Sequence, residues 1–424
     1  MIQYLKILED LERKFKVTED YSFGELVNFK INKRIPIHRW FNYIEGYSDQ
    51  LVRSLLKRNN VSNSDYYVLD PFVGVGTTLV TSQSLGISSI GLEVNPVASF
   101  ATKVKTFNYT KRDISEIESY LSNLESYLSD SKIVPKYKKL RNIFTDTQLN
   151  QILKIKGFYE NIDKEHIRNF FKLAYLSIIE DCSNRVKDGN GIKIAKRKQP
   201  IEFVTQYFVE QCNRMTQDLK HAQRDPRSEV VFIHGSILES KIKEKLKKFP
   251  ISMSIFSPPY ANCFDYCEQY KMEIWLGDFV TEYEDFKEYR KLAIRSHVNA
   301  KFDPRVTNYN SEVEVIASLV STYNIWNKDI PNMLRGYFDD MEEVIGILYS
   351  LLIPGALCFI VVANSSYKGI IVPSDLILAN ISRKKGFKVK EIISARRIRA
   401  SSQQISHLQR KSHLMRESII TLYK

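Results

Sequence analysis

The chain has 424 residues, of which 43% are hydrophobic, so it is long enough for two or three domains with a substantial core. Its formal net charge of +13 favours a polyanionic partner, with a basic protein that binds no polyanion as the alternative. The sequence shows neither a secretory signal nor an apolar run of transmembrane length, which predicts a cytoplasmic protein without membrane contact.

The first 65 residues predict two helices on either side of an aromatic cluster. Apolar and charged residues recur at helical spacing over 1–16. Ser48 suits the N-cap of a helix over 49–57, because its hydroxyl accepts a hydrogen bond from a free backbone N–H. The aromatic residues of 36–47, which include Trp40, either cover a sheet edge or form the wall of a ligand pocket.

A strand, a glycine loop and a helix come next. The β-branched and aromatic run at 66–70 predicts a buried strand, and Gly74 and Gly76 end it in a tight loop before a helical run. A second strand at 88–93 places Glu93 at its tip, about 20 residues beyond the loop, where a doubly wound sheet holds ribose hydroxyls. This pattern predicts a nucleoside-cofactor site at the carboxyl end of a parallel sheet.

The loop sequence narrows the choice of cofactor. A dinucleotide fingerprint needs a third glycine where this chain has Leu79, and a phosphate-binding P-loop needs lysine where it has Thr77. Asp70 would repel a phosphate but suits a cationic ligand such as a sulfonium amino acid. The alternative is an ordinary strand–loop–helix that binds no ligand.

The composition of the chain changes at residue 111, and the segment 111–228 is rich in charged residues. Its charge-rich periodic runs predict helices over 114–128, 147–158, 164–179 and 203–222. Between the last two lies 182–198, which is predicted to be a loop by its Asp-Gly-Asn-Gly core and carries six basic residues. A helical insertion with a basic loop favours contact with nucleic acid, with a solvated loop as the alternative.

Two further strands, 229–236 and 251–256, lead to Ser257-Pro258-Pro259-Tyr260. Two prolines remove two backbone donors, so this loop presents carbonyl and hydroxyl acceptors beside an aromatic face. Such a loop is suited to hold an exocyclic amino group by its hydrogens while the ring stacks on tyrosine. The nearby Cys263 and Cys267 have no histidine or second cysteine pair beside them, so we expect no zinc or other metal.

The last 90 residues complete the predicted sheet. A helix at 339–352 precedes a hydrophobic strand at 355–364, and 388–393 and 417–422 form an antiparallel pair. The basic segment 395–404 is expected on the nucleic-acid side, with its arginines on phosphates.

The glycine-loop sequence at 70–77 together with Ser257-Pro258-Pro259-Tyr260 resembles the amino-group DNA methyltransferases, particularly those that methylate cytosine N4. The resemblance extends over 261–266 and includes Trp40-Phe41, and it covers about half of the chain. Two features depart from the family pattern. The large insertion lies between the second and third strands, and the third strand ends in Gly235-Ser236, where many relatives carry an acid.

The resemblance implies a cofactor and two sets of site residues. S-adenosylmethionine would be bound by residues of the first half and the third strand, namely Trp40, Asp70, Pro71, Phe72, Gly74, Gly76, Thr77, Glu93 and Ser236. The catalytic set would be Ser257, Pro258, Pro259 and Tyr260. Ser257 would orient the amine of a flipped base, the Pro258 carbonyl would accept its proton, and Tyr260 would stack on the ring.

We therefore expect an α/β protein with a Rossmann-like methyltransferase sheet. Residues 1–110 would form its cofactor-binding part, 111–228 a helical insertion for DNA recognition, and 229–424 its catalytic part. The expected activity is transfer of a methyl group from S-adenosylmethionine to cytosine N4 in duplex DNA, beside a cognate restriction endonuclease. A cytosine C5 enzyme is disfavoured because it needs a cysteine after proline.

Three alternatives stay open. The target could be adenine N6 in DNA, or an amine in RNA or protein, since related Asn-Pro-Pro-Tyr loops act on other planar amines. The chain could also be a cofactor-gated DNA-binding subunit without catalytic activity.

Overall fold

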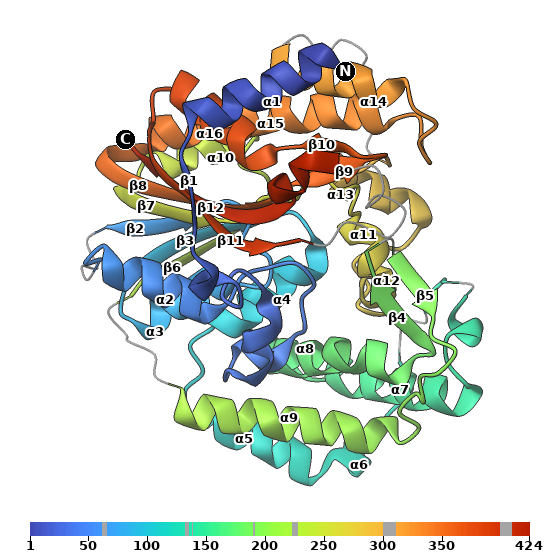
Figure 1. Ribbon diagram of the computed structural model, residues 1–424. Helices are drawn as coiled ribbons and strands as arrows, with labels where there is room; N and C mark the ends of the chain where they lie inside the picture. Colours follow the sequence, from blue (N-terminus) through green and yellow to red (C-terminus); the bar gives the residue numbers. More distant parts are fainter. Residues whose placement is uncertain are drawn as a thin grey trace.

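The computed structural model describes residues 1–61, 66–131, 135–137, 139–189, 191–222, 228–299, 311–398 and 409–424. Their centre is an eight-stranded sheet with the order β1-β11-β12-β8-β7-β2-β3-β6 (Figure 1). The strands are β1 (Val17–Glu19), β2 (Tyr67–Asp70), β3 (Ser88–Glu93), β6 (Val230–His234), β7 (Ile251–Phe256), β8 (Leu352–Ala363), β11 (Lys388–Arg397) and β12 (Arg416–Tyr423). Only β12 runs antiparallel to its neighbours, β8 and β11. The predicted Rossmann-like sheet and its terminal antiparallel pair are thus confirmed.

Helices cover both faces of the sheet, which explains the apolar strands. Neighbouring residues point to opposite faces: Leu69 and Ile360 pack in one core cluster, and Val68 and Val361 in another. The first cluster includes α1 (Ile2–Lys14), α10 (Ser240–Leu246), α14 (Ser311–Ser321), α15 (Ile330–Leu351) and α16 (Ser374–Lys384). On the opposite face lie α2 (Asp49–Arg58), α3 (Thr77–Ser84) and α4 (Pro96–Thr106) (Figure 1).

A group of helices lies between α4 and β6, in the segment that the sequence predicts to be a helical insertion. Its helices are α5 (Lys111–Ser122), α6 (Leu124–Tyr127), α7 (Asp146–Glu160), α8 (Glu165–Cys182) and α9 (Val204–His221). Asn123 interrupts the single helix expected over 114–128. These helices share a core cluster with α4 and with α12 (Lys271–Leu276), so the insertion packs against the sheet domain.

The prediction of a loop at 182–198 is wrong. The segment contains a hairpin of β4 (Arg185–Asp188) and β5 (Gly191–Ile194), in which Val186 pairs with Lys193. Apolar and basic residues alternate on both sides of the turn, which is a strand pattern. The turn residues Asp188, Gly189 and Gly191 were the stronger signal, so the short strands around them were missed.

The remaining elements are short. They are α11 (Tyr266–Gln269), α13 (Phe286–Leu292), β9 (Ser365–Tyr367), β10 (Ile370–Val372), η1 (Tyr21–Phe23), η2 (Phe29–Arg34), η3 (His38–Trp40), η4 (Leu140–Asn142), η5 (Tyr283–Asp285) and η6 (Gln409–Leu414). The helix expected from 339 begins earlier, at Ile330, because Pro331 is tolerated in a first turn. None of the helices among the described residues is long and apolar enough to span a bilayer.

A buried carboxylate fastens the insertion to the N-terminal segment. Asp218 on α9 accepts hydrogen bonds from the backbone N–H of Ile37 (2.9 Å), from Nε of Arg39 (3.0 Å) and from the indole Nε1 of Trp40 (3.0 Å). Asp218 and Trp40 are both buried. The indole of Trp40 therefore belongs to this joint.

This joint can be tested by removing the carboxylate. Asp218→Ala leaves the buried donors of Ile37 and Trp40 without partners, at a cost of about 1–3 kcal/mol each. We expect urea denaturation to show a loss of at least about 2 kcal/mol in the free energy of unfolding. The control is Glu210→Ala on the exposed face of the same helix, which should stay within about 0.5 kcal/mol of the parent. Equal free energies of unfolding for Asp218→Ala and the parent would contradict this role of Asp218.

Candidate functional site

A cavity opens where the carboxyl ends of four parallel strands meet. It is lined by Phe72 from the loop after β2, Glu93 from the end of β3, Ser236 from the loop after β6 and Ser257 from the loop after β7. Pro71, Gly74, Thr77 and Pro259 also line it. The structure thus gathers eight of the thirteen predicted site residues in one place. We call it the first cavity.

The glycine loop is shaped by protein contacts on both sides. Gly74 has φ +54°, and a Cβ there would lie 3.0 Å from Cε1 of Tyr43, an aromatic residue of the cavity wall. Gly76 has φ +88°, but a Cβ there would meet Oγ1 of Thr102 on α4 at 3.1 Å. Gly76 therefore permits close packing on a helix and does not line the cavity.

Glu93 is held by the backbone around it. Its Oε2 accepts from the N–H of Gly74 (2.9 Å), and its Oε1 accepts from the N–H groups of Val94 (2.9 Å) and Asn95 (2.8 Å). Burial raises the pKa of this carboxyl to about 7. The amide Nδ2 of Asn95 also faces this region, since Asn95 lines the cavity and its Nδ2 is buried without a hydrogen-bond partner among the described residues.

Asp70 is buried and does not line the first cavity. Its carboxylate is 1% exposed and accepts from the hydroxyls of Tyr47 (2.6 Å) and Thr78 (2.6 Å) and from the N–H of Phe72 (3.0 Å). Burial raises its pKa to about 6. The sequence suggested that Asp70 faces a cationic ligand. In the structure it is enclosed, and it is Tyr47 that lines the cavity.

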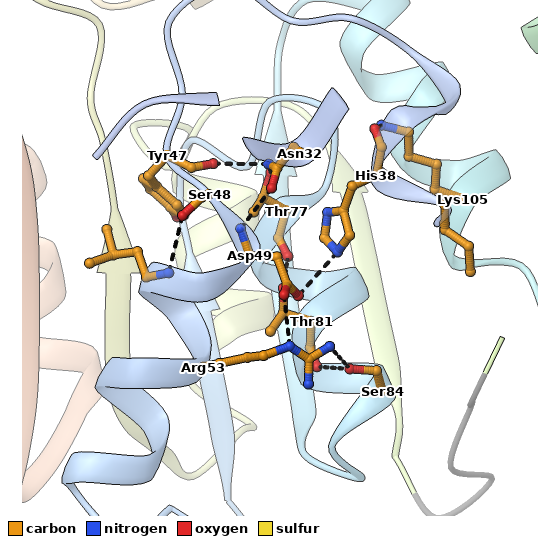
Figure 2. A network of polar contacts seen from close by, with 12 residues as sticks. Asn32, His38, Tyr47, Ser48, Asp49, Arg53, Thr77, Thr81, Ser84 and Lys105 are labelled. Carbon is orange, nitrogen blue, oxygen red and sulfur yellow. Dashed lines mark hydrogen bonds and ion pairs between the residues drawn. The ribbon is translucent and has the colours of Figure 1, made fainter. Parts of the chain in front are cut away.

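A polar network holds the aromatic wall against α3 (Figure 2). The amide of Asn32 donates to the carbonyl of Tyr47 (3.1 Å) and to Oγ1 of Thr77 (3.3 Å), and its oxygen accepts from the N–H of Asp49 (2.8 Å). The Asp49 carboxylate in turn accepts from Thr81 on α3 (2.8 Å). The segment before β2 is therefore fixed to the helix that follows the glycine loop.

The predicted catalytic loop lies between this cavity and a second one. Ser257 and Pro259 line the first cavity and Tyr260 lines the second, while Pro258 is buried and lines neither. The hydroxyl of Ser257 donates to the Tyr260 oxygen (3.1 Å), and the Tyr260 hydroxyl donates to Oε1 of Glu417 on β12 (2.6 Å). Nε of Arg396 pairs with the other oxygen of Glu417.

The second cavity adjoins the first. Phe29, Glu45 and Gly46 line both cavities. The second cavity is otherwise lined by Val27, Asn28, Tyr260, Asn262, Trp326, Ala363, Asn364, Ser365, Ser366, Tyr367, Arg396, Arg397, Ile398 and Glu417. Trp326 is 67% exposed, which leaves its ring face free for a planar partner.

Sequence reasoning missed several of these residues. Glu45 and Glu417 stand in no recognisable motif, and each reaches its neighbours only through the fold. Tyr43 and Tyr47 belong to the aromatic segment for which a pocket wall was one of two interpretations, and both line the first cavity.

The first cavity fits S-adenosylmethionine by its chemistry. Glu93 keeps lone pairs for ribose hydroxyls, Asn95 offers an unpartnered amide donor, and aromatic faces such as Tyr43 and Phe72 suit a planar base or a sulfonium cation. When bound, the cofactor supplies an electrophilic methyl group.

Comparison with known proteins agrees with this chemistry. A protein-family model described as DNA methylase matches residues 31–104, from η2 to α4. The type II methyltransferase M.BsoBI of Geobacillus stearothermophilus is 26% identical, over 95% of this chain and 88% of that protein. The type II methyltransferase M.AvaI of a Nostoc species is 27% identical, over 92% and 87%, and M.MvaI of Kocuria varians is 21% identical, over 89% and 87%.

The glycine loop gives a test of cofactor binding. Gly74→Ala forces a left-handed conformation on an L-residue, which costs about 1–2 kcal/mol, and requires the Tyr43 ring in the cavity wall to shift by a few tenths of an ångström. We expect calorimetry to show at least about tenfold weaker binding of S-adenosylmethionine. The control is Gly189→Ala, whose Cβ would meet no atom within 4 Å and should bind as the parent does. Unchanged affinity in a folded Gly74→Ala protein would refute this role.

Proposed function

Because the chain belongs to the amino-group DNA methyltransferases, whose members take their methyl group from S-adenosylmethionine, we propose that it methylates cytosine N4 in duplex DNA. The observation that carries the proposal is the place of Ser257-Pro258-Pro259-Tyr260 between two adjoining cavities. Cofactor in the first cavity and a flipped base in the second would meet at this loop. The similarity to type II methyltransferases also supports a role beside a cognate restriction endonuclease.

The hydrogen-bond directions at the loop support an amine substrate. An ionised Glu417 can only accept, so the Tyr260 hydroxyl must donate to it, and the Ser257 hydroxyl then donates to Tyr260. Ser257 therefore presents only its lone pairs to a substrate. Together with the Pro258 carbonyl it would accept the two hydrogens of an exocyclic amine, which orients the nitrogen lone pair for attack.

The choice of cytosine N4 rests on Ser257. A serine hydroxyl accepts a weaker hydrogen bond than the carboxylate or amide that adenine N6 enzymes of this family carry at this position. Its short side chain suits a base with one ring. The Tyr260 ring, tethered through its hydroxyl, would stack on that base.

The basic residues divide into buried and exposed groups. Lys187 is 4% exposed and paired with Glu180 and Glu273, and Lys198 donates to two backbone carbonyls, so neither is available to DNA. Arg396 pairs with Glu417 and Arg397 with Glu19, while Arg399 lies outside the described residues. The exposed basic residues of the hairpin segment are Lys196 and Arg197, together with Lys193, which pairs with Asp188. We assign phosphate contact to Lys196 and Arg197.

Nucleoside mass spectrometry tests the target atom. Duplex DNA incubated with the protein and labelled S-adenosylmethionine should yield label in N4-methylcytosine. Label in N6-methyladenine would overturn the cytosine assignment, but the assignment as an amino-group methyltransferase would still hold. Label confined to RNA, or sequence-specific DNA binding with no label, would overturn the proposed function.

Salt dependence tests the assigned phosphate contacts. In the double variant Lys196→Gln/Arg197→Gln, the slope of log affinity against log salt should become shallower by about 0.9 for each phosphate that the protein no longer neutralises. The matched control is Lys247→Gln/Lys248→Gln, because these exposed lysines precede the amino end of β7, whereas the cavities open at the carboxyl ends of the strands. Equal slopes for the two variants would show that the hairpin segment faces away from DNA.

A further inference from the structure

Glu45 lies at the junction of the two cavities in a strained conformation. It lines both of them and has φ +62°, a left-handed value that side chains other than glycine seldom adopt. The chain is fixed on either side of it. The N–H of Ile44 donates to the hydroxyl of Tyr270 (2.9 Å), and Tyr47 is tied to Asp70. The surrounding structure therefore holds Glu45 in place despite the strain.

One oxygen of this carboxyl group is unused. Oε1 of Glu45 accepts from Nδ2 of Asn262 (3.5 Å), whereas Oε2 is buried and has no hydrogen-bond partner among the described residues. A buried oxygen without a hydrogen-bond partner destabilises the ligand-free protein, and a ligand contact would relieve this cost.

The other carboxylates that line the cavities are engaged at both oxygens. Glu93 accepts from three backbone N–H groups. Asp265 accepts from two backbone N–H groups and from Arg290 and Asn299. Glu417 accepts from Tyr260 and pairs with Arg396. Among the described lining residues, Glu45 is thus the carboxylate with an oxygen that accepts no hydrogen bond.

We propose that Glu45 is the catalytic base that accepts the proton released by the methylated amine. This rests on the proposed function, because it needs an exocyclic amine in the second cavity. The amine nitrogen forms a bond to the methyl carbon, the carbon–sulfur bond breaks with its electron pair on sulfur, and one N–H proton passes to Oε2 of Glu45. Ser257 and the Pro258 carbonyl orient the amine by accepting hydrogen bonds, but neither is basic enough to keep the proton.

The surroundings tune this group to neutral pH. Burial, and then the negative charge of Glu417, raise the pKa of Glu45 to about 7, against the hydrogen bond from Asn262 and the positive charge of Arg396. A base works best with a pKa near the working pH. The other titratable groups that face Glu45 are Tyr43, Tyr260, Tyr266 and Tyr270.

The proposed role of Glu45 as a base fixes the direction of the pH dependence. The base is active when ionised, so the rate should fall as the pH drops below about 7. We call this fall the acid limb of the pH–rate profile. Glu45→Gln keeps the acceptor for Asn262, but its single-turnover rate above about pH 7.5 should be at least about 100-fold lower. Its pH–rate profile should also lack the acid limb. Affinities for DNA and S-adenosylmethionine should stay within about threefold, and Glu25→Gln, on the exposed surface of the same segment, should match the parent.

Two variants should shift the midpoint of the acid limb of the pH–rate profile in opposite directions. Asn262→Ala removes a hydrogen bond that lowers the pKa of Glu45, so its midpoint should shift to higher pH. Glu417→Gln removes a negative charge and should shift the midpoint to lower pH, while a weakened tether of Tyr260 lowers the rate. Carboxyl carbon NMR of the ligand-free protein should show a glutamate titrating near 7 that Glu45→Gln lacks.

The outcomes separate the two proposals. If the parent protein transfers no methyl group to DNA, the proposed function fails. If the parent methylates DNA and Glu45→Gln does so at the same rate and with the same pH limb, the function stands and the role of Glu45 is refuted. Midpoints that do not move in folded Asn262→Ala and Glu417→Gln proteins would refute it as well.

Discussion

The arrangement of the reactive groups depends on one chain of hydrogen bonds, from Ser257 through Tyr260 to Glu417. Glu417 lies on β12, the reversed strand, and Ser257 follows β7, two strands away in the sheet. Because the Glu417 carboxylate accepts at the end of this chain, the Tyr260 hydroxyl donates to Glu417 and the Ser257 hydroxyl donates to Tyr260. The serine is left as an acceptor, which is what a poorly nucleophilic amine requires. Burial and Glu417 also hold the pKa of Tyr260 well above its ordinary value, so the phenol stays a donor.

A second constraint acts on the opposite wall. The segment before β2 must bring Tyr43, Glu45 and Tyr47 to the cavity edge, although it has little regular structure of its own. Asp70 and the Asn32 network supply that order, by tying the segment to the glycine loop and α3. The insertion helps from outside through Asp218. The strained backbone at Glu45 is tolerable because these ties lie on both sides of it.

The sequence predicted the sheet well, because apolar strands and glycine loops are local signals. Strand boundaries at 88–93 and 251–256 agree with β3 and β7. It failed at β4 and β5, where turn residues outweighed four-residue strands. Within the site, motif residues such as Gly74, Glu93 and Ser257 could be found from their spacing. Glu45 and Glu417 could not, because Glu45 meets Asn262 across 217 residues, and Glu417 meets Tyr260 across 157. The motif residues Trp40, Asp70 and Gly76 lie behind the wall, since sequence spacing does not tell a lining residue from a supporting one.

In the proposed mechanism, cofactor and target base occupy adjoining cavities that meet at the Ser257 loop. This arrangement can be tested by a crystal structure of the protein with a non-reactive S-adenosylmethionine analogue and duplex DNA that carries the unmethylated target site. We expect the ribose at Glu93, a flipped base in the second cavity beside Tyr260, and its exocyclic amine facing Ser257 and Glu45. A base left in the duplex, or one whose amine points away from Ser257, would contradict it.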